Sequence, residues 1–297
     1  MYILINVMVR SDQMYFVIKN NFGLAPSGGL AMLKKFTIKF LTALLPLSLL
    51  APVSVLAGDS LLDEIIDRGT IRIGSTLQYP PQMYRDESGD PAGYDVELMK
   101  MLANDIGVEL EVVDMDFPGL IPALLASKVD MLSVGLVNTP ERALSLEFTD
   151  GYVPYSQVVV VQKDSPHEAI GDLNEDGMKI TALLGSTAEN LAQTKFPNAE
   201  VVGLQQQEAM MEVASARADG VVLEEYLALP FVANNPDKVR VLNPGTPFSD
   251  AFGTWAVRPG DYRWLQYLNN WLRYYKAKGT IDAMYAAIIE PTFYKTD

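Results

Sequence analysis

The sequence predicts an α/β fold with a largely parallel sheet, built from two successive series of strands and helices. Between Ile71 and Val134, short apolar runs alternate with stretches whose apolar residues recur at helical spacing. The same alternation resumes at Lys179 and continues to Leu242. A polar stretch at 164–177 separates the two series, which repeat in pattern and not in sequence.

The first series begins with an amphipathic helix at 61–68, which ends at Gly69, and a strand at 71–74. Tyr79-Pro80-Pro81 predicts a rigid turn. The elements expected after it are a helix at 94–106, a strand at 108–113, a helix at 120–127 and a strand at 129–134. This order is typical of a sheet covered by helices.

The second series follows an almost wholly apolar strand at 158–161. Ser186 and Glu189 have the spacing of a capping box, which marks the start of one helix. The strands expected are 179–183, 200–202, 220–223, 239–242 and 254–257. The helices expected are 188–196, 206–216, 224–233, 264–277 and 281–289.

Residues 32–57 have the pattern of a secretory signal peptide. Three lysines near its start precede an apolar region at 40–50, and a possible cleavage site ends at Ala57. The apolar run is shorter than the roughly 20 residues that span a bilayer, which argues against a membrane anchor. Residues 1–31 precede this signal, so we expect a true start at Met32 and a mis-assigned extension before it. A genuine extra N-terminal segment is the alternative.

Cleavage after Ala57 leaves 240 of the 297 residues, enough for two lobes. The whole chain has a net charge of −14; residues 1–57 carry five basic side chains and one aspartate, so the remainder carries −18. This charge argues against nucleic acid or an anionic membrane as a partner. We expect a soluble monomer in the periplasm.

The absence of cysteine excludes disulfides, a thiolate nucleophile and a cysteine metal site. It also excludes the lipid-anchored form of an exported protein, which needs a cysteine at the cleavage site. The single histidine, His167, lies in a polar loop and leaves little for a catalytic triad or a histidine metal site. We expect no cofactor and no metal.

Arg142 is the first candidate for a binding residue. It follows an apolar, strand-like run, Met131 to Val137, and Pro140 suits the first turn of a short helix. A guanidinium held just past a strand donates two parallel hydrogen bonds to a carboxylate. By itself the stretch is also compatible with a surface arginine after a core strand.

A second candidate is the helix start at Gly185-Ser186-Thr187. Free N–H groups and the positive end of the helix dipole bind anions there. An ordinary helix cap is the simpler explanation. If the two series face each other, this element and Arg142 converge on one anion.

Three further side chains are expected at the carboxyl edge of the sheet, where ligands of open α/β folds bind. Tyr79 and Phe117 each follow a strand of the first series, and the alternative is that both are core aromatic residues. Glu224 directly follows the strand at 220–223 and could hold an ammonium group. As an acid at a helix N-terminus, it could instead simply favour the helix dipole.

Together these segments resemble the family 3 extracellular solute-binding proteins, the amino-acid receptors of ATP-driven (ABC) importers. The resemblance runs from Asp59 to about Ile288. The segments that carry it are Gly69–Gly74, Tyr79-Pro80-Pro81, Gly93–Leu98, Leu120–Leu124, Asp130 with Thr139–Arg142, Gly185–Thr187 and Ala218–Val222.

The resemblance implies a two-lobed periplasmic-binding-protein fold of type II with two hinge strands and the ligand in the cleft between the lobes. The hinge strands would be about 157–162 and 251–257. Lobe 1 would comprise 58–157 and 252–297, and lobe 2 would comprise 158–251.

The resemblance also implies roles for site residues. Arg142 and the backbone N–H of Thr187, next to Ser186, would hold the ligand carboxylate, and Glu224 would hold the ammonium. The remaining implied site residues are Gly135 and Val137, through backbone groups, and Tyr79 and Phe117, as walls of the side-chain pocket. Three positions depart from the usual pattern, namely Val137 for a hydroxyl residue, Glu224 for aspartate and Gln82 for phenylalanine.

Two functions remain open. The first is a receptor that binds a polar or neutral α-amino acid, or a related small solute, closes by hinge bending and docks on a membrane permease. The second is an enzyme on the same scaffold, similar to periplasmic cyclohexadienyl dehydratases, with Glu224 as general acid. A sensor domain would need a further membrane or signalling segment after the fold.

Overall fold

The computed structural model describes residues 5–10, 13–18 and 60–292. The predicted signal peptide at 32–57 lies outside these residues. The chain divides into two compact units, Met1–Val55 and Leu56–Asp297. In the first unit, β1 (Ile5–Arg10) pairs antiparallel with β2 (Gln13–Ile18).

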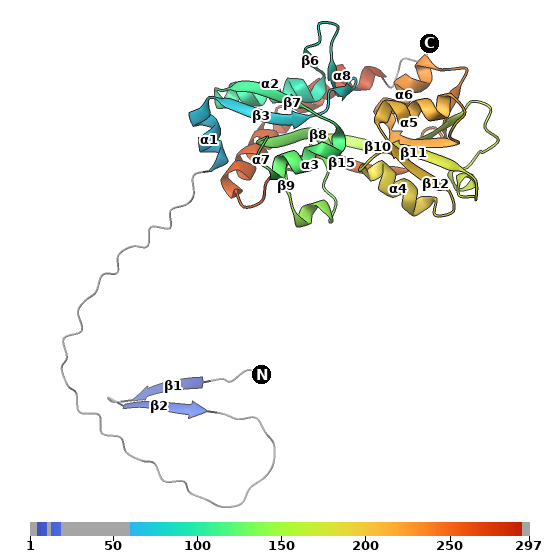
Figure 1. The fold of residues 1–297 in the computed structure, drawn as a ribbon. Helices are drawn as coiled ribbons and strands as arrows, with labels where there is room; N and C mark the ends of the chain where they lie inside the picture. Colours follow the sequence, from blue (N-terminus) through green and yellow to red (C-terminus); the bar gives the residue numbers. More distant parts are fainter. Residues whose placement is uncertain (1–4, 11–12, 19–59, 293–297) are drawn as a thin grey trace, which may run out of the picture. The chain divides into compact units, whose positions relative to one another are not determined.

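A ten-stranded sheet organises the second unit (Figure 1). Its main path runs β12-β11-β13-β10-β15-β8-β3-β7. The strands on this path are β3 (Thr70–Ser75), β7 (Glu109–Asp114), β8 (Met131–Val137), β10 (Val153–Gln162), β11 (Lys179–Leu183), β12 (Glu200–Leu204), β13 (Gly220–Glu224) and β15 (Ser249–Val257). Two short strands complete it, β9 (Glu147–Phe148) beside β15 and β14 (Val239–Leu242) beside β10.

The sheet is parallel at its ends and antiparallel in its middle. β3 pairs parallel with β7 and β8, and β11 pairs parallel with β12 and β13. β10 and β15 run antiparallel to all their neighbours. The pattern of apolar residues marks a buried strand but carries no information on the direction in which that strand runs. The prediction of a largely parallel sheet was therefore wrong for the two central strands.

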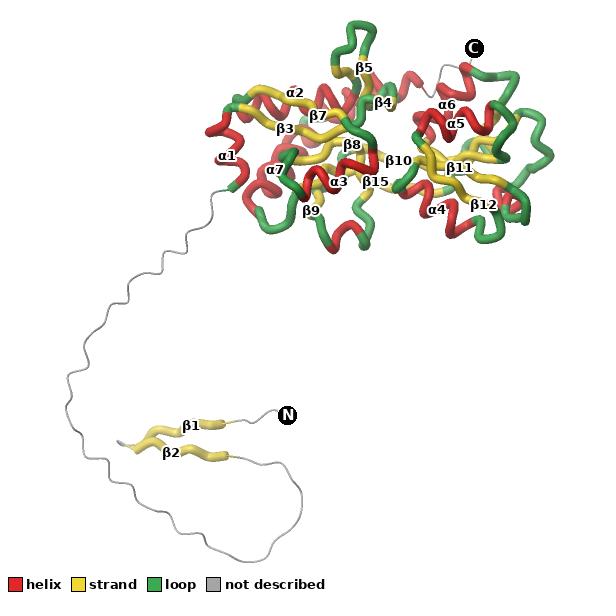
Figure 2. Tube along the Cα trace, viewed as in Figure 1, coloured by secondary structure: helices red, strands yellow, loops and turns green. Residues whose placement is uncertain are grey.

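Helices flank the sheet (Figure 2). They are α1 (Leu61–Arg68), α2 (Tyr94–Ile106), α3 (Phe117–Leu125), α4 (Thr187–Lys195), α5 (Gln206–Ala214), α6 (Glu225–Asn234), α7 (Tyr262–Ala277) and α8 (Thr280–Ile288). Short 3-10 turns are η1 (Arg142–Leu144), η2 (Ile170–Leu173) and η3 (Glu290–Thr292), and a small sheet joins β4 (Gln78–Tyr79), β5 (Met83–Arg85) and β6 (Pro91–Ala92). Both α4 and α5 pack against β11, and α3 packs against β3 and β8.

Local signals explain most helix boundaries. α1 begins after Ser60, whose hydroxyl accepts from the N–H of Leu62, and it ends at Gly69 in the left-handed region. α3 begins at Phe117, three residues earlier than predicted, because extended Asp116 and Pro118 already form a helix start.

The two central strands are longer than predicted. β10 starts at Val153 and β15 at Ser249, about five residues before the expected starts. Side chains of β10 alternate between two buried clusters, with Val158 and Val160 in the larger one and Val159 and Val161 in the smaller. The positions expected for the hinge strands, 157–162 and 251–257, lie within β10 and β15.

None of the described helices is both long and apolar enough to cross a bilayer.

Candidate ligand-binding site

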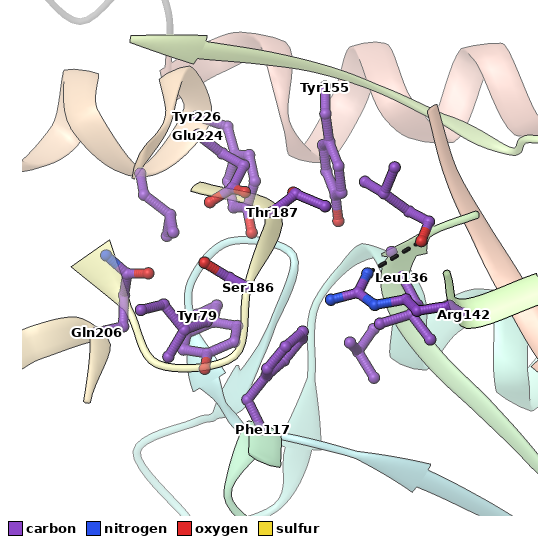
Figure 3. Close-up of a pocket in the computed structure, with 15 residues that line it drawn as sticks. Tyr79, Phe117, Leu136, Arg142, Tyr155, Ser186, Thr187, Gln206, Glu224 and Tyr226 are labelled. Carbon is purple, nitrogen blue, oxygen red and sulfur yellow. Dashed lines mark hydrogen bonds between the residues drawn. The ribbon is translucent and has the colours of Figure 1, made fainter. Parts of the chain in front are cut away.

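One pocket lies where the carboxyl ends of the outer strands meet (Figure 3). All eight predicted site residues line it: Tyr79, Phe117, Gly135, Val137, Arg142, Ser186, Thr187 and Glu224. The other lining residues are Val134, Leu136, Tyr155, Leu183, Gln206, Tyr226 and Leu227. The carboxyl ends of parallel strands lie at the same edge of a sheet, and residues that follow strands of both series line this pocket.

Arg142 lies at the start of η1, anchored by its backbone N–H on the Thr139 hydroxyl at 3.2 Å. The N–H of Ala143 donates to the carbonyl of Thr139 at 3.0 Å, so Pro140 lies in the first turn of the short helix, as predicted. The guanidinium donates to the carbonyl of Val137 at 2.9 Å and of Gly185 at 3.0 Å. Its central carbon lies 5.9 Å from the centre of the Phe117 ring.

No carboxylate within residues 60–292 forms an ion pair with Arg142. Burial lowers the pKa of its guanidinium, and nearby Glu141 opposes that shift. A desolvated cation whose partners are two neutral carbonyls retains a strong affinity for an anion.

Glu224 is the last residue of β13 and the N-cap of α6, where its side chain makes no capping bond. Its carboxyl group accepts a long hydrogen bond from Gln157 Nε2, at 3.4 Å. Burial raises the pKa of this carboxyl, although the Gln157 bond and its own backbone N–H oppose the shift. Like Arg142, Glu224 lines the pocket with no opposite charge paired to it among the described residues.

The start of α4 presents the helix N-terminus to the same pocket. The Ser186 hydroxyl accepts from the N–H of Glu189 at 3.2 Å. The Glu189 carboxylate reaches back to the N–H of Gly185 at 2.6 Å, one residue earlier than in a standard capping box. Thr187 is the first helical residue, so its N–H has no acceptor within the helix.

Aromatic rings form the walls of the pocket. Tyr79 is buried, and Phe117 lies beside Arg142. On another wall, Tyr155 and Tyr226 stack with ring centres 5.7 Å apart. Neither of these two tyrosines was predicted, because tertiary packing alone brings β10 against α6.

Gly135 has a backbone geometry that other residues avoid. Its φ is +62°, and a Cβ built on it would lie 1.5 Å from the Tyr155 hydroxyl. Its N–H donates to the Tyr152 hydroxyl at 2.9 Å. Tyr152 donates in turn to a carboxylate oxygen of Asp95 at 2.6 Å.

Asp95 is therefore the acceptor at the centre of a buried network behind the pocket. It also accepts from Gln82 Nε2 at 3.1 Å and from the Ser133 hydroxyl at 3.2 Å. Gln82 in turn accepts from the Tyr155 hydroxyl at 2.7 Å. Burial raises the pKa of Asp95 to about 7, although the three donors oppose that shift. The sequence analysis noted Gln82 only as a departure and did not identify the role of Asp95.

Gln206 is the most informative residue that the sequence analysis missed. It is the first residue of α5, directly beyond the carboxyl end of β12. Its side chain is 1% exposed and lines the pocket, yet its Nε2 has no hydrogen-bond partner. The strand-end rule that selected Tyr79 and Glu224 also points to the three glutamines at 205–207, of which Gln206 is the buried one.

Groups of acidic, histidine or cysteine side chains able to hold a metal ion are absent from the described part of the chain. The site instead combines one cation, one anion, a helix N-terminus and aromatic walls. This set matches the two charges of a zwitterion in chemistry.

Comparison with known proteins identifies the family. The model of the bacterial extracellular solute-binding proteins, family 3, matches residues 71–290, and the chain belongs to this family. The arginine-binding extracellular protein ArtP of Bacillus subtilis is 31% identical over 63% of this chain and 73% of its own length. Cyclohexadienyl dehydratase of Pseudomonas aeruginosa is 26% identical over 80% of this chain and 90% of its own.

Solved structures agree with the fold. The ancestral amino acid-binding protein AncCDT-1, described as a precursor of cyclohexadienyl dehydratase, has a TM-score of 0.72 and 35% identity. That match covers 77% of this chain and all of the other. A putative ABC transporter binding component of Wolinella succinogenes, complexed with lysine, has a TM-score of 0.69 and 28% identity over 75% and 96% of the two chains. The mixed α/β fold is thus that of the amino-acid binding proteins.

Proposed function

We propose that this protein is the periplasmic receptor of an ABC importer and binds an α-amino acid in the pocket of Arg142 and Glu224. One observation carries the proposal. A guanidinium and a carboxyl group line the same pocket, both are partly buried, and neither pairs with an opposite charge among residues 60–292. Buried charges without partners are costly, so a ligand that supplies both counter-charges is strongly favoured.

An α-amino acid supplies both charges on one carbon. Its carboxylate can accept two hydrogen bonds from Arg142 and a third from the N–H of Thr187 at the start of α4. Its ammonium can donate to Glu224. Gly135 and Val137 also line the pocket. The Ser186 hydroxyl already accepts a hydrogen bond from the N–H of Glu189 as the helix cap.

The relatives indicate which class of amino acid the ligand belongs to. ArtP is named as arginine-binding, and the Wolinella protein was solved with lysine. A cationic side chain could stack on the faces of Tyr79 and Phe117, since an aromatic ring attracts a cation over its face. Basic amino acids therefore come first in a ligand screen.

Binding would close two lobes around the ligand. Lobe 1 would comprise 58–157 and 252–297 and lobe 2 would comprise 158–251, with β10 and β15 as the hinge strands. The hydrogen bond from Arg142 to Gly185 then spans the two proposed lobes. A ligand that contacts both lobes stabilises the closed form, which would dock on the permease.

A dehydratase is the second candidate, and one observation favours it. The raised pKa of Glu224 suits a general acid, and one relative is a cyclohexadienyl dehydratase. The same shift follows from burial alone, so it does not by itself require catalysis.

A thermal-shift screen of the exported protein with the standard amino acids and prephenate separates the two functions. A ligand at 100 times its Kd stabilises by about 2.7 kcal/mol, or roughly 5–10 °C for a protein of this size. We expect such a shift with an amino acid and no turnover of prephenate. If no amino acid shifts the melting temperature and the protein converts prephenate, it is an enzyme and not a receptor.

A further inference from the structure

Tyr155 and Glu224 lie on the same face of the sheet, where it borders the pocket. In the antiparallel pairing of β10 with β13, Gln157 lies opposite Glu224, and Gln157 Nε2 is 3.4 Å from the Glu224 carboxyl oxygen. Tyr155 precedes Gln157 by two residues, so its side chain points to the same face of β10. Diagonal neighbours of this kind are within reach of long and aromatic side chains. The pocket therefore takes a hydroxyl and a carboxyl group from adjacent strands.

The Tyr155 hydroxyl is held at the pocket-lining part of β8. A Cβ built on Gly135 would lie 1.5 Å from this hydroxyl, so the oxygen lies directly against a residue that lines the pocket. In Figure 3 the Tyr155 ring extends from β10 with its hydroxyl end pointing into the pocket. The stacked ring of Tyr226 holds the Tyr155 ring in this position.

The single proton of the Tyr155 hydroxyl is directed away from the pocket. The hydroxyl donates to Gln82 Oε1 at 2.7 Å, which is its one hydrogen bond among residues 60–292. Gln82 Nε2 donates in turn to Asp95 Oδ1 at 3.1 Å. A carboxylate oxygen only accepts, so the amide nitrogen of Gln82 must face Asp95 and the amide oxygen must face Tyr155.

A proton on Asp95 leaves this arrangement in place. The second carboxyl oxygen, Oδ2, faces the hydroxyls of Ser133 and Tyr152, which can accept as well as donate. A proton taken up by Asp95 would therefore occupy Oδ2, and Oδ1 would still accept from Gln82. Burial raises the pKa of the Tyr155 hydroxyl well above its usual value, so Tyr155 keeps its own proton. Its oxygen can offer only lone pairs to a ligand.

We propose that the Tyr155 oxygen is a second acceptor for the ligand ammonium beside Glu224, and that Gln82 is a positioning residue that keeps this oxygen an acceptor. This inference rests on the proposed function. An ammonium has three donors and no acceptor, so it can bind both groups at once. A hydroxyl has one proton, so it can donate to only one of them and sets its own lone pairs against the other. The two acceptors therefore select an amino acid over the hydroxy acid with the same side chain.

Calorimetric titration tests this selection. The ligands are arginine, or the amino acid with the largest thermal shift, and the α-hydroxy acid with the same side chain. Tyr155→Phe keeps the ring and removes the oxygen, so amino-acid binding should weaken by about tenfold, the value of one hydrogen bond to a charged group. Binding of the hydroxy acid should change by less than about threefold, because it does not need the second acceptor.

Gln82→Met tests the positioning role, since it keeps a similar volume and leaves the tyrosine proton without its acceptor. It should lower the preference for the amino acid in the same direction as Tyr155→Phe. In a protein that already carries Tyr155→Phe it should not change this preference further, because Gln82 acts through the hydroxyl. Tyr155→Phe alone still decides the acceptor role if Gln82→Met does not fold.

Tyr94→Phe is the matched control, because it removes a buried hydroxyl that donates to the backbone carbonyl of Tyr152 and does not line the pocket. It should leave both Kd values unchanged. An unchanged preference in Tyr155→Phe, an equal loss of both ligands, or an effect of Gln82→Met that persists without the hydroxyl would overturn the inference and leave the receptor intact. Failure of every amino acid to bind would remove the proposed function as well.

Discussion

At the residue scale, Arg142 carries the proposed carboxylate clamp. Arg142→Ala removes a partly buried cation that forms no ion pair within residues 60–292, so binding should weaken by about a hundredfold or more while the melting temperature changes little. Calorimetry and thermal unfolding measure the two effects. Arg217→Ala, at an exposed ion pair with Glu212, is the control. Unchanged affinity in Arg142→Ala would contradict the clamp.

Glu224 predicts a pH dependence of binding. Burial raises the pKa of its carboxyl, so without ligand it takes up a proton at a higher pH than an ordinary glutamate. The ligand ammonium prefers the ionised form, so affinity should fall as pH falls through this raised pKa, and binding should release a proton. Titrations in buffers of different ionisation enthalpy detect that proton. Glu224→Gln should weaken binding and remove both effects; a pH dependence that persists in this variant would assign it to another group.

The raised pKa of Asp95 leads us to expect that this group makes the folded state less stable as the pH rises, which is the opposite of ordinary acid denaturation. Its pKa is about 7 when folded and near 3.8 when unfolded, so the folded state binds more protons between these values. Raising the pH through this window should therefore lower the free energy of unfolding, by up to roughly 4 kcal/mol from this group. Urea unfolding at pH 4 to 7 measures it. Asp95→Asn should remove that part of the slope, and parallel curves for the two proteins would contradict the assignment.

At the element scale, β8 contains a residue with a positive φ, Gly135, where the strand lines the pocket. Gly135→Ala forces a positive φ on alanine and places a methyl group against the Tyr155 hydroxyl. Strain alone costs about 1 kcal/mol, and the steric clash should raise the loss of stability to several kcal/mol. Gly177→Ala is the matched control, since Gly177 also has a positive φ but open space around its Cβ position. Equal losses in the two variants, measured by urea unfolding, would show that the contact with Tyr155 is unimportant.

The order of strands and helices was predictable, and so was the edge at which the ligand-binding residues gather. Each of Tyr79, Phe117, Arg142, Thr187 and Glu224 follows or ends a strand, and this local rule is sufficient to place them in one pocket. The antiparallel middle of the sheet was not predictable from periodicity, because a hydrophobic pattern marks a strand without giving its direction.

The polar network behind the pocket could not be predicted from the sequence either. Asp95, Gln82 and Tyr155 are far apart in the chain, and only the packed fold shows that their hydrogen bonds form one chain of donors. The strand-end rule points to the three glutamines at 205–207, which follow β12. The sequence does not indicate which of the three is buried, and the structure shows that it is Gln206.

At the scale of the whole molecule, one continuous sheet links both α/β series, and the pocket takes residues from each. The Arg142 guanidinium donates a hydrogen bond to the carbonyl of Gly185 in the second series. In the proposed receptor, a ligand carboxylate would compete for this guanidinium and bridge it to the start of α4. Closure would then depend on the contacts of the ligand with both sides.

The most direct test is a crystal structure of the protein with an amino acid that binds it. We expect the carboxylate of the ligand within hydrogen-bond distance of the Arg142 guanidinium and the N–H of Thr187, and its ammonium within the same distance of Glu224. A bound amino acid elsewhere on the molecule, or one in this pocket whose carboxylate does not contact Arg142, would contradict the account.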